Sequence, residues 1–308
     1  MTKILPYRNK RDNIIIAIVL LITSIVITNS FIIFSPDEDS RFYFSGLTSS
    51  FTVAVGLVIS IVMVYRYKIS IKKQKEMQQV LLNRNDLSVC LFFAFWLVAS
   101  VSWIFEDQKA PGVLIADILY YMGYALFGYF VYSLYYHFFR REFEPFILIL
   151  IGVLILVPLI FIVDTIVSTL RLLSTQTVDI SLVVVNTSYP ILDAIVIFPI
   201  ALMFWGVRRI SSRHKNTATE EKESGKSSSS VFVSGSTSIW VLLLLVAMVL
   251  SAAGDSGFAY TSAFDVTTVQ NYIWIWNVLY NSDHLCLAAA LIGYRHFFSF
   301  NRIETLQH

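Results

Sequence analysis

Eight long apolar runs constrain this chain more than any other feature of its sequence. They lie at about 13–34, 47–67, 87–105, 113–139, 145–163, 183–207, 239–260 and 273–297. A helix needs roughly 20 residues to cross a hydrocarbon core of about 30 Å, and each run is close to that length. The runs lack the strict alternation of a barrel strand. Because the chain is 56% apolar and 14% charged, we expect an all-α polytopic membrane helix bundle with eight transmembrane helices.

The basic residues indicate the orientation of this bundle. With the N-terminus inside, 20 of the 23 Lys and Arg residues fall in inner segments, and only Arg41, Lys109 and Arg171 fall outside. By the positive-inside rule we expect both termini in the cytoplasm and the protein in the cytoplasmic membrane. The positive charges then face the inner leaflet of the lipid bilayer, and we expect no nucleic-acid partner.

The two halves of the chain share a pattern. Residues 87–124 contain WLVASVSWIFED followed by ADILYYMGY, and residues 239–284 contain LVAMVLSAAGDSGFAY followed by WNVLYNSDH. We therefore expect two four-helix repeats, 1–139 and 140–308. The first would carry an amphipathic inner loop at 68–86 and the second a disordered inner loop at 211–238. Repeated halves of membrane proteins commonly place a binding site at their interface.

Four carboxylates lie inside apolar runs with no Lys or Arg close by: Asp117, Asp193, Asp255 and Asp283. A charge in the bilayer is costly, so such residues usually face a cavity or mark a functional site. Counting along the helices places Asp117 and Asp255 about 6 Å from the outer end, and Asp193 and Asp283 about 15 Å deep. We expect an outward-facing cleft with an acidic rim over a deeper acidic pair.

Tyrosines accompany these acids at helical spacing. Each Asp has a Tyr about one turn away that could donate a hydrogen bond to it, and Pro190 and Pro199 could free backbone carbonyls beside Asp193. His284 is the one deep histidine, and we expect it to be a core residue rather than a ligand. The expected ligand-binding residues are Asp117, Tyr120, Tyr124, Tyr189, Asp193, Asp255, Tyr280 and Asp283.

Three functions are consistent with buried acids that have no fixed cation. The first is a membrane sensor or ligand-binding module, and the alternative is a proton- or cation-coupled transporter that uses Asp193 and Asp283. The third, an enzyme acting on a lipid, lacks a legible nucleophile or metal constellation, so we expect no enzyme and no metal site. The ligand and any cofactor stay open.

Several stretches resemble a polytopic membrane input region found on archaeal and bacterial signalling proteins, ahead of histidine kinase or diguanylate cyclase domains. They are SYPILDAIVIFPIAL (Ser188–Leu202), SAAGDSGFAY (Ser251–Tyr260), IWNVLYNSDHLCLAAALIGY (Ile275–Tyr294) and VLIADILYYMGYALFGYF (113–130). The resemblance implies a membrane-embedded sensing module. Because this sequence ends at His308 without an output domain, it implies a stand-alone subunit that signals through a cytoplasmic or membrane partner.

Overall fold

The computed structural model describes residues 10–71, 77–105, 115–139, 180–223, 236–262 and 266–304, and five single helical positions between 152 and 167. Within these ranges the chain is helical apart from the turn at 34–37, with no strand. The all-helical fold is therefore confirmed for the described part. The elements are α1 (Lys10–Ile33), α2 (Glu38–Ile71), α3 (Met77–Phe105), α4 (Ile115–Leu134), the π-helical turn η1 (Tyr135–Phe139), α6 (Ile180–Glu223), α7 (Ser236–Ser262) and α8 (Val266–Glu304).

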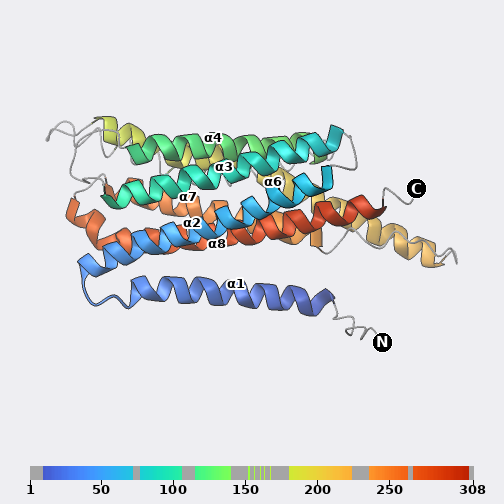
Figure 1. Cartoon of the computed structure of the whole chain (residues 1–308), viewed down its shortest axis with the longest axis horizontal. Coiled ribbons are helices and arrows are strands. Elements are labelled where there is room, and N and C mark those ends of the chain that lie inside the picture. The colour runs from blue at the N-terminus through green and yellow to red at the C-terminus, as the bar shows by residue number, and fades with distance from the viewer. Residues whose placement is uncertain are drawn as a thin grey trace.

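Six of these helices close into a ring. Going round it, α2 packs on α3, α3 on α4, α4 on α6, α6 on α7, α7 on α8, and α8 returns to α2. The remaining helix, α1, lies outside the ring against α2 and α8, and it runs alongside them in Figure 1. Helices α3 and α7 end, and α2, α4, α6 and α8 begin, at one end of the bundle, which we call the pocket end.

Among the described residues, five helices are long and apolar enough to cross a membrane. They are α1, α2, α3, α6 and α7, over Ile15–Ile33, Ser40–Tyr65, Arg84–Phe105, Thr187–Val207 and Ile239–Tyr260. Large aliphatic side chains point outward from them, for example Leu20 and Val58, which are each about three-fifths exposed (62% and 61%). An apolar exterior of this kind suits lipid rather than water. The structure therefore supports a membrane-embedded helical bundle.

Aromatic side chains fill the ring below the pocket end. Phe92 of α3 stacks on Phe127 of α4 at a centroid distance of 4.9 Å, and Phe130 meets Tyr294 of α8 edge to face at 5.5 Å. Together with the fully buried Trp240 of α7 they belong to the main hydrophobic core. This layer closes the interior of the ring on the side away from the pocket end.

Helix α6 continues through both of its prolines. Proline has no N–H to donate, so Pro199 leaves the carbonyl of Ile195 without its helical partner. The hydroxyl of Tyr132 on α4 donates to that carbonyl oxygen at 3.3 Å. The expected release of a backbone carbonyl by proline is thus seen, and the carbonyl serves helix packing rather than a ligand.

The two expected inner loops are shorter than the sequence indicated. Helix α2 runs on to Ile71 and α3 begins at Met77, so most of the expected loop 68–86 belongs to these two helices. Likewise α6 extends to Glu223, well into the 211–238 segment expected to be disordered. Most of the expected fifth span, 145–163, lies outside the described residues, and the count of eight spans stays a prediction.

Candidate functional site

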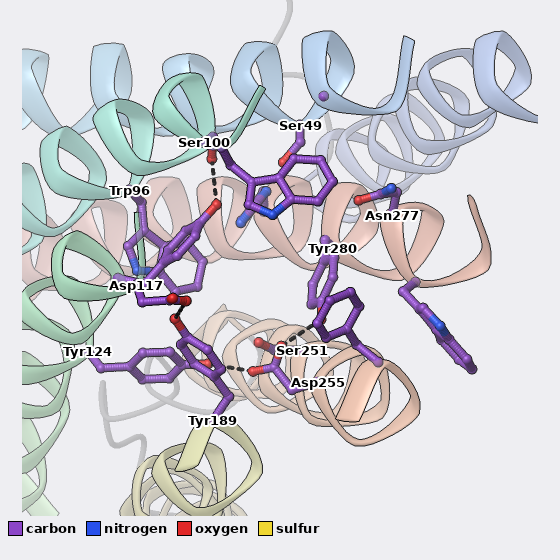
Figure 2. Close-up of a pocket in the computed structure, with 16 residues that line it drawn as sticks. Ser49, Trp96, Ser100, Asp117, Tyr124, Tyr189, Ser251, Asp255, Asn277 and Tyr280 are labelled. Atoms are coloured by element: carbon purple, nitrogen blue, oxygen red, sulfur yellow. Dashed lines mark hydrogen bonds between the residues drawn. The ribbon is translucent and has the colours of Figure 1, made fainter. Parts of the chain in front are cut away.

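A cavity of about 140 Å³ opens at the pocket end, in the middle of the ring. Figure 2 shows the side chains that surround it. All six ring helices contribute to its wall, so its shape depends on how all of them pack. The lining residues are Gly46, Ser49, Trp96, Ser100, Trp103, Asp117, Tyr120, Tyr124, Tyr189, Ser251, Asp255, Phe258, Trp276, Asn277, Tyr280 and His284.

Helical spacing brings these side chains to the inside of the ring. On α3, Trp96, Ser100 and Trp103 lie at i, i+4 and i+7, which is one face of a helix. Residues 251, 255 and 258 of α7 repeat the same spacing, and 117, 120 and 124 of α4 follow i, i+3 and i+7. Each of these helices therefore presents a polar and aromatic stripe to the cavity and an apolar surface outward.

The acids at the cavity receive hydrogen bonds from tyrosines of other helices. Tyr189 of α6 donates to Asp117 Oδ1 of α4 at 2.7 Å. Tyr280 of α8 donates to Asp255 Oδ1 of α7 at 2.6 Å. The sequence predicted that each Asp would pair with a Tyr one turn away on its own helix. The observed bonds join different helices, because an Asp and a Tyr on the same helix face point in the same direction, into the ring, and not toward each other. The bonds that form instead tie adjacent helices together.

Tyr124 links two carboxyl groups. Its hydroxyl oxygen lies 2.7 Å from Asp193 Oδ1 of α6 and 2.9 Å from Asp255 Oδ2 of α7. A hydroxyl carries one proton and donates to one carboxylate at a time. The second contact is favourable only when that carboxyl group is protonated and donates to the tyrosine oxygen. Asp193, Tyr124 and Asp255 thus form a unit suited to holding one extra proton.

The two deeper acids do not line the main cavity. Asp193 is fully buried behind Tyr124, and Asp283 is 3% exposed. Asp283 borders a second, small cavity of about 10 Å³, which shares Trp96, Tyr124 and Ser251 with the main one. The sequence predicts Asp117 and Asp255 at a rim with Asp193 and Asp283 below it. In the structure Asp117 and Asp255 line the main cavity, and Asp193 and Asp283 do not.

His284 lines the cavity, although the sequence favoured a core role for it. Its Nδ1 lies 3.3 Å from the Thr52 hydroxyl of α2, and its ring packs edge to face on Trp96 at 5.2 Å. Its Nε2 lies 3.4 Å from Asp283 Oδ1. The histidine is 4% exposed, so it is both a core residue and part of the wall.

Six of the eight expected ligand-binding residues meet at the cavity: Asp117, Tyr120, Tyr124, Tyr189, Asp255 and Tyr280. Sequence reasoning missed the contribution of α2 and α3, above all the tryptophans. A usable signal was present, because Trp96, Ser100 and Trp103 interrupt an apolar run at the spacing of one helix face.

Two carboxyl groups line the cavity. In the described part of the chain, the lining includes Asp117 and Asp255 and no Lys or Arg. Among the residues that the structure describes, no group of three or more His, Cys, Asp or Glu side chains could hold a metal ion. The cysteines Cys90 and Cys286 are not disulfide-bonded. The site can accept hydrogen bonds and positive charge, and it presents aromatic surface.

No family model, curated protein or solved structure matches this chain. The fold and the site alone define its class, which is an all-helical membrane protein with a central cavity lined by aromatic and acidic side chains. The relationship to signalling input regions therefore stays an expectation from the sequence.

Proposed function

We propose that the protein is an integral membrane sensor or ligand-binding module that signals through a partner. One observation carries the proposal: the cavity takes part of its wall from each of the six ring helices. A ligand bound there contacts all of them at once. Occupancy can then favour one arrangement of the helices over another, which is the physical requirement for a sensor.

The topology expected from the basic residues places the pocket end outside the cell. In that topology Arg41, Lys109 and Arg171 are assigned to the outer side, and the other Lys and Arg residues are assigned to the inner side. In this orientation both termini are cytoplasmic, and α4 and α8 cross the membrane with the other helices. A ligand would enter from outside, and a signal would reach a partner at the inner ends of α6 and α8.

The order of the helices around the ring supports an internal repeat. If α2, α3 and α4 are matched in order with α6, α7 and α8, each contact between neighbours in one half has its counterpart in the other half. The contact α4–α6 between the halves corresponds to the contact α8–α2. The cavity then lies between two related halves, as in other repeat-built membrane proteins. This arrangement, and the resemblance to signalling input regions, agree with a sensing role.

Chemical labelling tests whether the cavity opens to the outside of the cell. In a background with Cys90 and Cys286 replaced by alanine, Ser49→Cys places a thiol in the cavity wall. We expect a membrane-impermeant maleimide to label it in intact cells. Ser60→Cys, on the same helix but fully buried, is the matched control and should stay unlabelled. Absence of labelling at residue 49 would contradict an outward-facing pocket.

Hydrogen exchange tests whether occupancy of the cavity changes the helices at the opposite end of the bundle. The maleimide adduct at residue 49 acts as a bound ligand, and hydrogen exchange of the labelled and unlabelled protein can be compared. We expect exchange to change near the end of α6 and at Arg295 of α8, on the opposite side of the membrane. A change confined to the pocket end would show an inert cavity and reject the sensing role.

A specific observation favours one alternative, a proton- or cation-coupled transporter. The buried acids continue inward from the main cavity, through Tyr124 to Asp193 and through the small cavity to Asp283. Proteoliposomes with an internal pH-sensitive dye distinguish the two functions. A proton or cation flux that is lost in Asp193→Asn would establish transport. Vesicles that are tight and show no flux would exclude transport and favour the sensing function.

A further inference from the structure

The hydroxyl group of Tyr124 has one proton for two carboxyl groups. Its oxygen lies 2.7 Å from Asp193 Oδ1 and 2.9 Å from Asp255 Oδ2. An ionised carboxylate only accepts hydrogen bonds, so with both acids ionised one of these contacts would bring two acceptors together. Both contacts are favourable when one carboxyl group keeps a proton and donates it to the tyrosine oxygen. The distances therefore require one proton more than Tyr124 itself supplies.

The burial of Asp193 gives a second, independent reason for a bound proton. The side chain is fully buried, and its Oδ2 receives no hydrogen bond from an N–H or hydroxyl group of the described residues. A buried carboxylate oxygen without a donor keeps its whole desolvation cost. A protonated carboxyl group carries no charge, and Asp255 is within hydrogen-bond reach of Asp193. One proton held between the two acids accounts for the unsatisfied oxygen and for the double contact of Tyr124.

Three titratable groups of α8 surround this pair. Tyr280 donates to Asp255 Oδ1 at 2.6 Å. Asp283 borders the small cavity beside Tyr124, and His284 Nε2 lies 3.4 Å from Asp283 Oδ1. The other titratable groups of the described cavity wall are Asp117 and Tyr120 of α4 and Tyr189 of α6. Among these neighbours, His284 is the second group whose ordinary titration falls near neutral pH, and it has to be separated from the acids by experiment.

The cavity connects the pair with its surroundings. Asp255 lines the cavity, with Tyr124 and Tyr280 on opposite sides of it in Figure 2, whereas Asp193 lies behind Tyr124. A proton that arrives on Asp255 Oδ2 can be donated to the Tyr124 oxygen while the Tyr124 hydroxyl proton passes to Asp193 Oδ1. Tyr124 then has one proton before and after the step. The pair can thus fill and empty through the cavity alone.

We propose that the signal sensed by this protein is the proton concentration outside the cell, and that Asp193 and Asp255, joined by Tyr124, are the proton-binding site. This inference rests on the proposed sensing function and names the ligand. With the proton bound, Tyr124 of α4 holds both α6 and α7. Helices α4 and α7 are not neighbours in the ring, so the bond from Tyr124 to Asp255 spans the interior of the ring.

Loss of the proton changes this link between helices. As the pH rises and the proton leaves, both acids are ionised and one hydroxyl proton remains for the two of them. One contact is then repulsive, and either α6 or α7 is released from α4. Proton binding therefore favours one arrangement of three helices over another, which is what a sensor requires of its ligand.

Infrared spectroscopy of the full chain detects the proton through the C=O stretching band of a protonated carboxyl group. The protein is kept at neutral pH in a detergent without ester groups. We expect Asp193→Asn and Asp255→Asn each to lose the band of one carboxyl group, and the double variant to lose no more than either single one. The asparagine amide donates to Tyr124 in place of the shared proton, so the remaining acid is ionised. Losses that add, or a band that persists in either variant, would overturn a shared proton.

Tryptophan fluorescence follows the response to pH, because Trp96 packs on Tyr124 at a centroid distance of 5.6 Å. We expect one transition between mildly acidic and mildly alkaline pH. Asparagine resembles a protonated carboxyl group, so Asp255→Asn should keep the acidic spectrum at every pH, and Asp193→Asn repeats the test if that variant folds poorly. Asp37→Asn, which removes an exposed carboxylate outside the cavity wall, should keep the transition. Absence of a transition in the unsubstituted protein would overturn the proposal.

His284→Gln separates the histidine from the acids. The His284 ring packs on the same tryptophan at 5.2 Å, so its titration would also change the fluorescence. We expect the transition to remain in His284→Gln. A transition that is lost in His284→Gln and kept in Asp255→Asn would assign the response to the histidine and overturn the proposal.

The sensing function and the proton site fail differently. Labelling of Ser49→Cys and transmission to the opposite end, without a pH transition, would remove the proton as the signal and leave the sensor. Loss of labelling or transmission would remove the sensing function, and the infrared band would still report whether the two acids share a proton.

Discussion

Tyr124 joins three of the ring helices through one hydroxyl group. It belongs to α4 and contacts Asp193 of α6 and Asp255 of α7. It is 5% exposed and packs edge to face on Trp96 of α3 at 5.6 Å. A buried polar group that loses its partner keeps its desolvation cost without compensation. The stability of the site should therefore depend strongly on this hydroxyl.

Replacing Tyr124 by Phe removes that hydroxyl and keeps the ring. We expect the free energy of unfolding to fall by about 1–3 kcal/mol, because both carboxyl groups lose a buried hydrogen-bond partner. Denaturant unfolding in nanodiscs measures the change. Tyr129→Phe, the same substitution on the exposed side of α4, is the control and should change stability little. Equal effects of the two substitutions would contradict the bridging role.

Glycine sets how closely α7 and α8 approach beside Asp255. A methyl group at Gly254 would lie 2.7 Å from Cε1 of Tyr280, which is the tyrosine that donates to Asp255. Carbon atoms do not pack that closely, so the ring would have to move. The position therefore couples the spacing of two helices to a hydrogen bond in the cavity wall.

Gly254→Ala should displace Tyr280 and lower the free energy of unfolding by about 1–3 kcal/mol, as overpacking does elsewhere. Gly128→Ala on α4 is the control, because a methyl group there meets no atom within 4 Å. That substitution should raise stability by up to about 1 kcal/mol through helix propensity. The prediction fails if both substitutions shift thermal unfolding in the same direction.

Helix α2 begins with an acidic cap. Asp37 accepts hydrogen bonds from the Ser40 backbone N–H at 2.7 Å and from the Ser40 hydroxyl at 2.9 Å. These bonds, the backbone one first, lower the pKa of Asp37 below its ordinary value of 3.8. The ionised carboxylate is therefore the form that stabilises the first turn of α2, as expected for an N-cap.

Because the folded-state pKa of Asp37 is lowered, the cap is present above the ordinary pKa and is lost as the pH falls through the lowered value. Asp37→Ala should speed hydrogen exchange in the first turn of α2 near neutral pH. The difference from the unsubstituted protein should vanish in strong acid, where the cap is already protonated. A difference that persists in strong acid would rule out an ionised cap.

At the scale of the whole molecule, α1 packs on the outside of the ring, against α2 and α8. Among the described residues, Asn29 makes polar contacts from α1 to the ring. Asn29 donates to the Ser282 hydroxyl at 3.0 Å and accepts from the Asn281 side chain at 3.3 Å. Most of α1 otherwise exposes apolar side chains, and interhelical hydrogen bonds of this kind act as attachments in a membrane.

Asn29→Ala should therefore loosen α1 without changing the cavity. We expect faster hydrogen exchange in α1 and a loss of about 1 kcal/mol in stability, while labelling at Ser49→Cys stays as it was. Ser30→Ala removes a hydroxyl that bonds only to its own helix, at Val26 O, and serves as the control. A change of cavity labelling in Asn29→Ala would show that α1 belongs to the site.

The sequence by itself determined the helical class, the membrane setting and much of the site. Long apolar runs leave a chain in lipid few options besides helices, because each helix satisfies its own backbone hydrogen bonds. Helical spacing also placed Asp117, Tyr120 and Tyr124 on one face, and these three residues share the cavity wall. Such patterns are local, so they can be read from the order of residues.

Only the tertiary structure decided which helices are neighbours and which partners the acids take. The bonds from Tyr189 to Asp117 and from Tyr124 to Asp193 join α4 and α6, which lie about 70 residues apart in the chain. The same packing turned Trp96 into a wall of the cavity and kept Asp193 and Asp283 behind it. A helix face has no partner until the ring closes, and this closure creates the cavity.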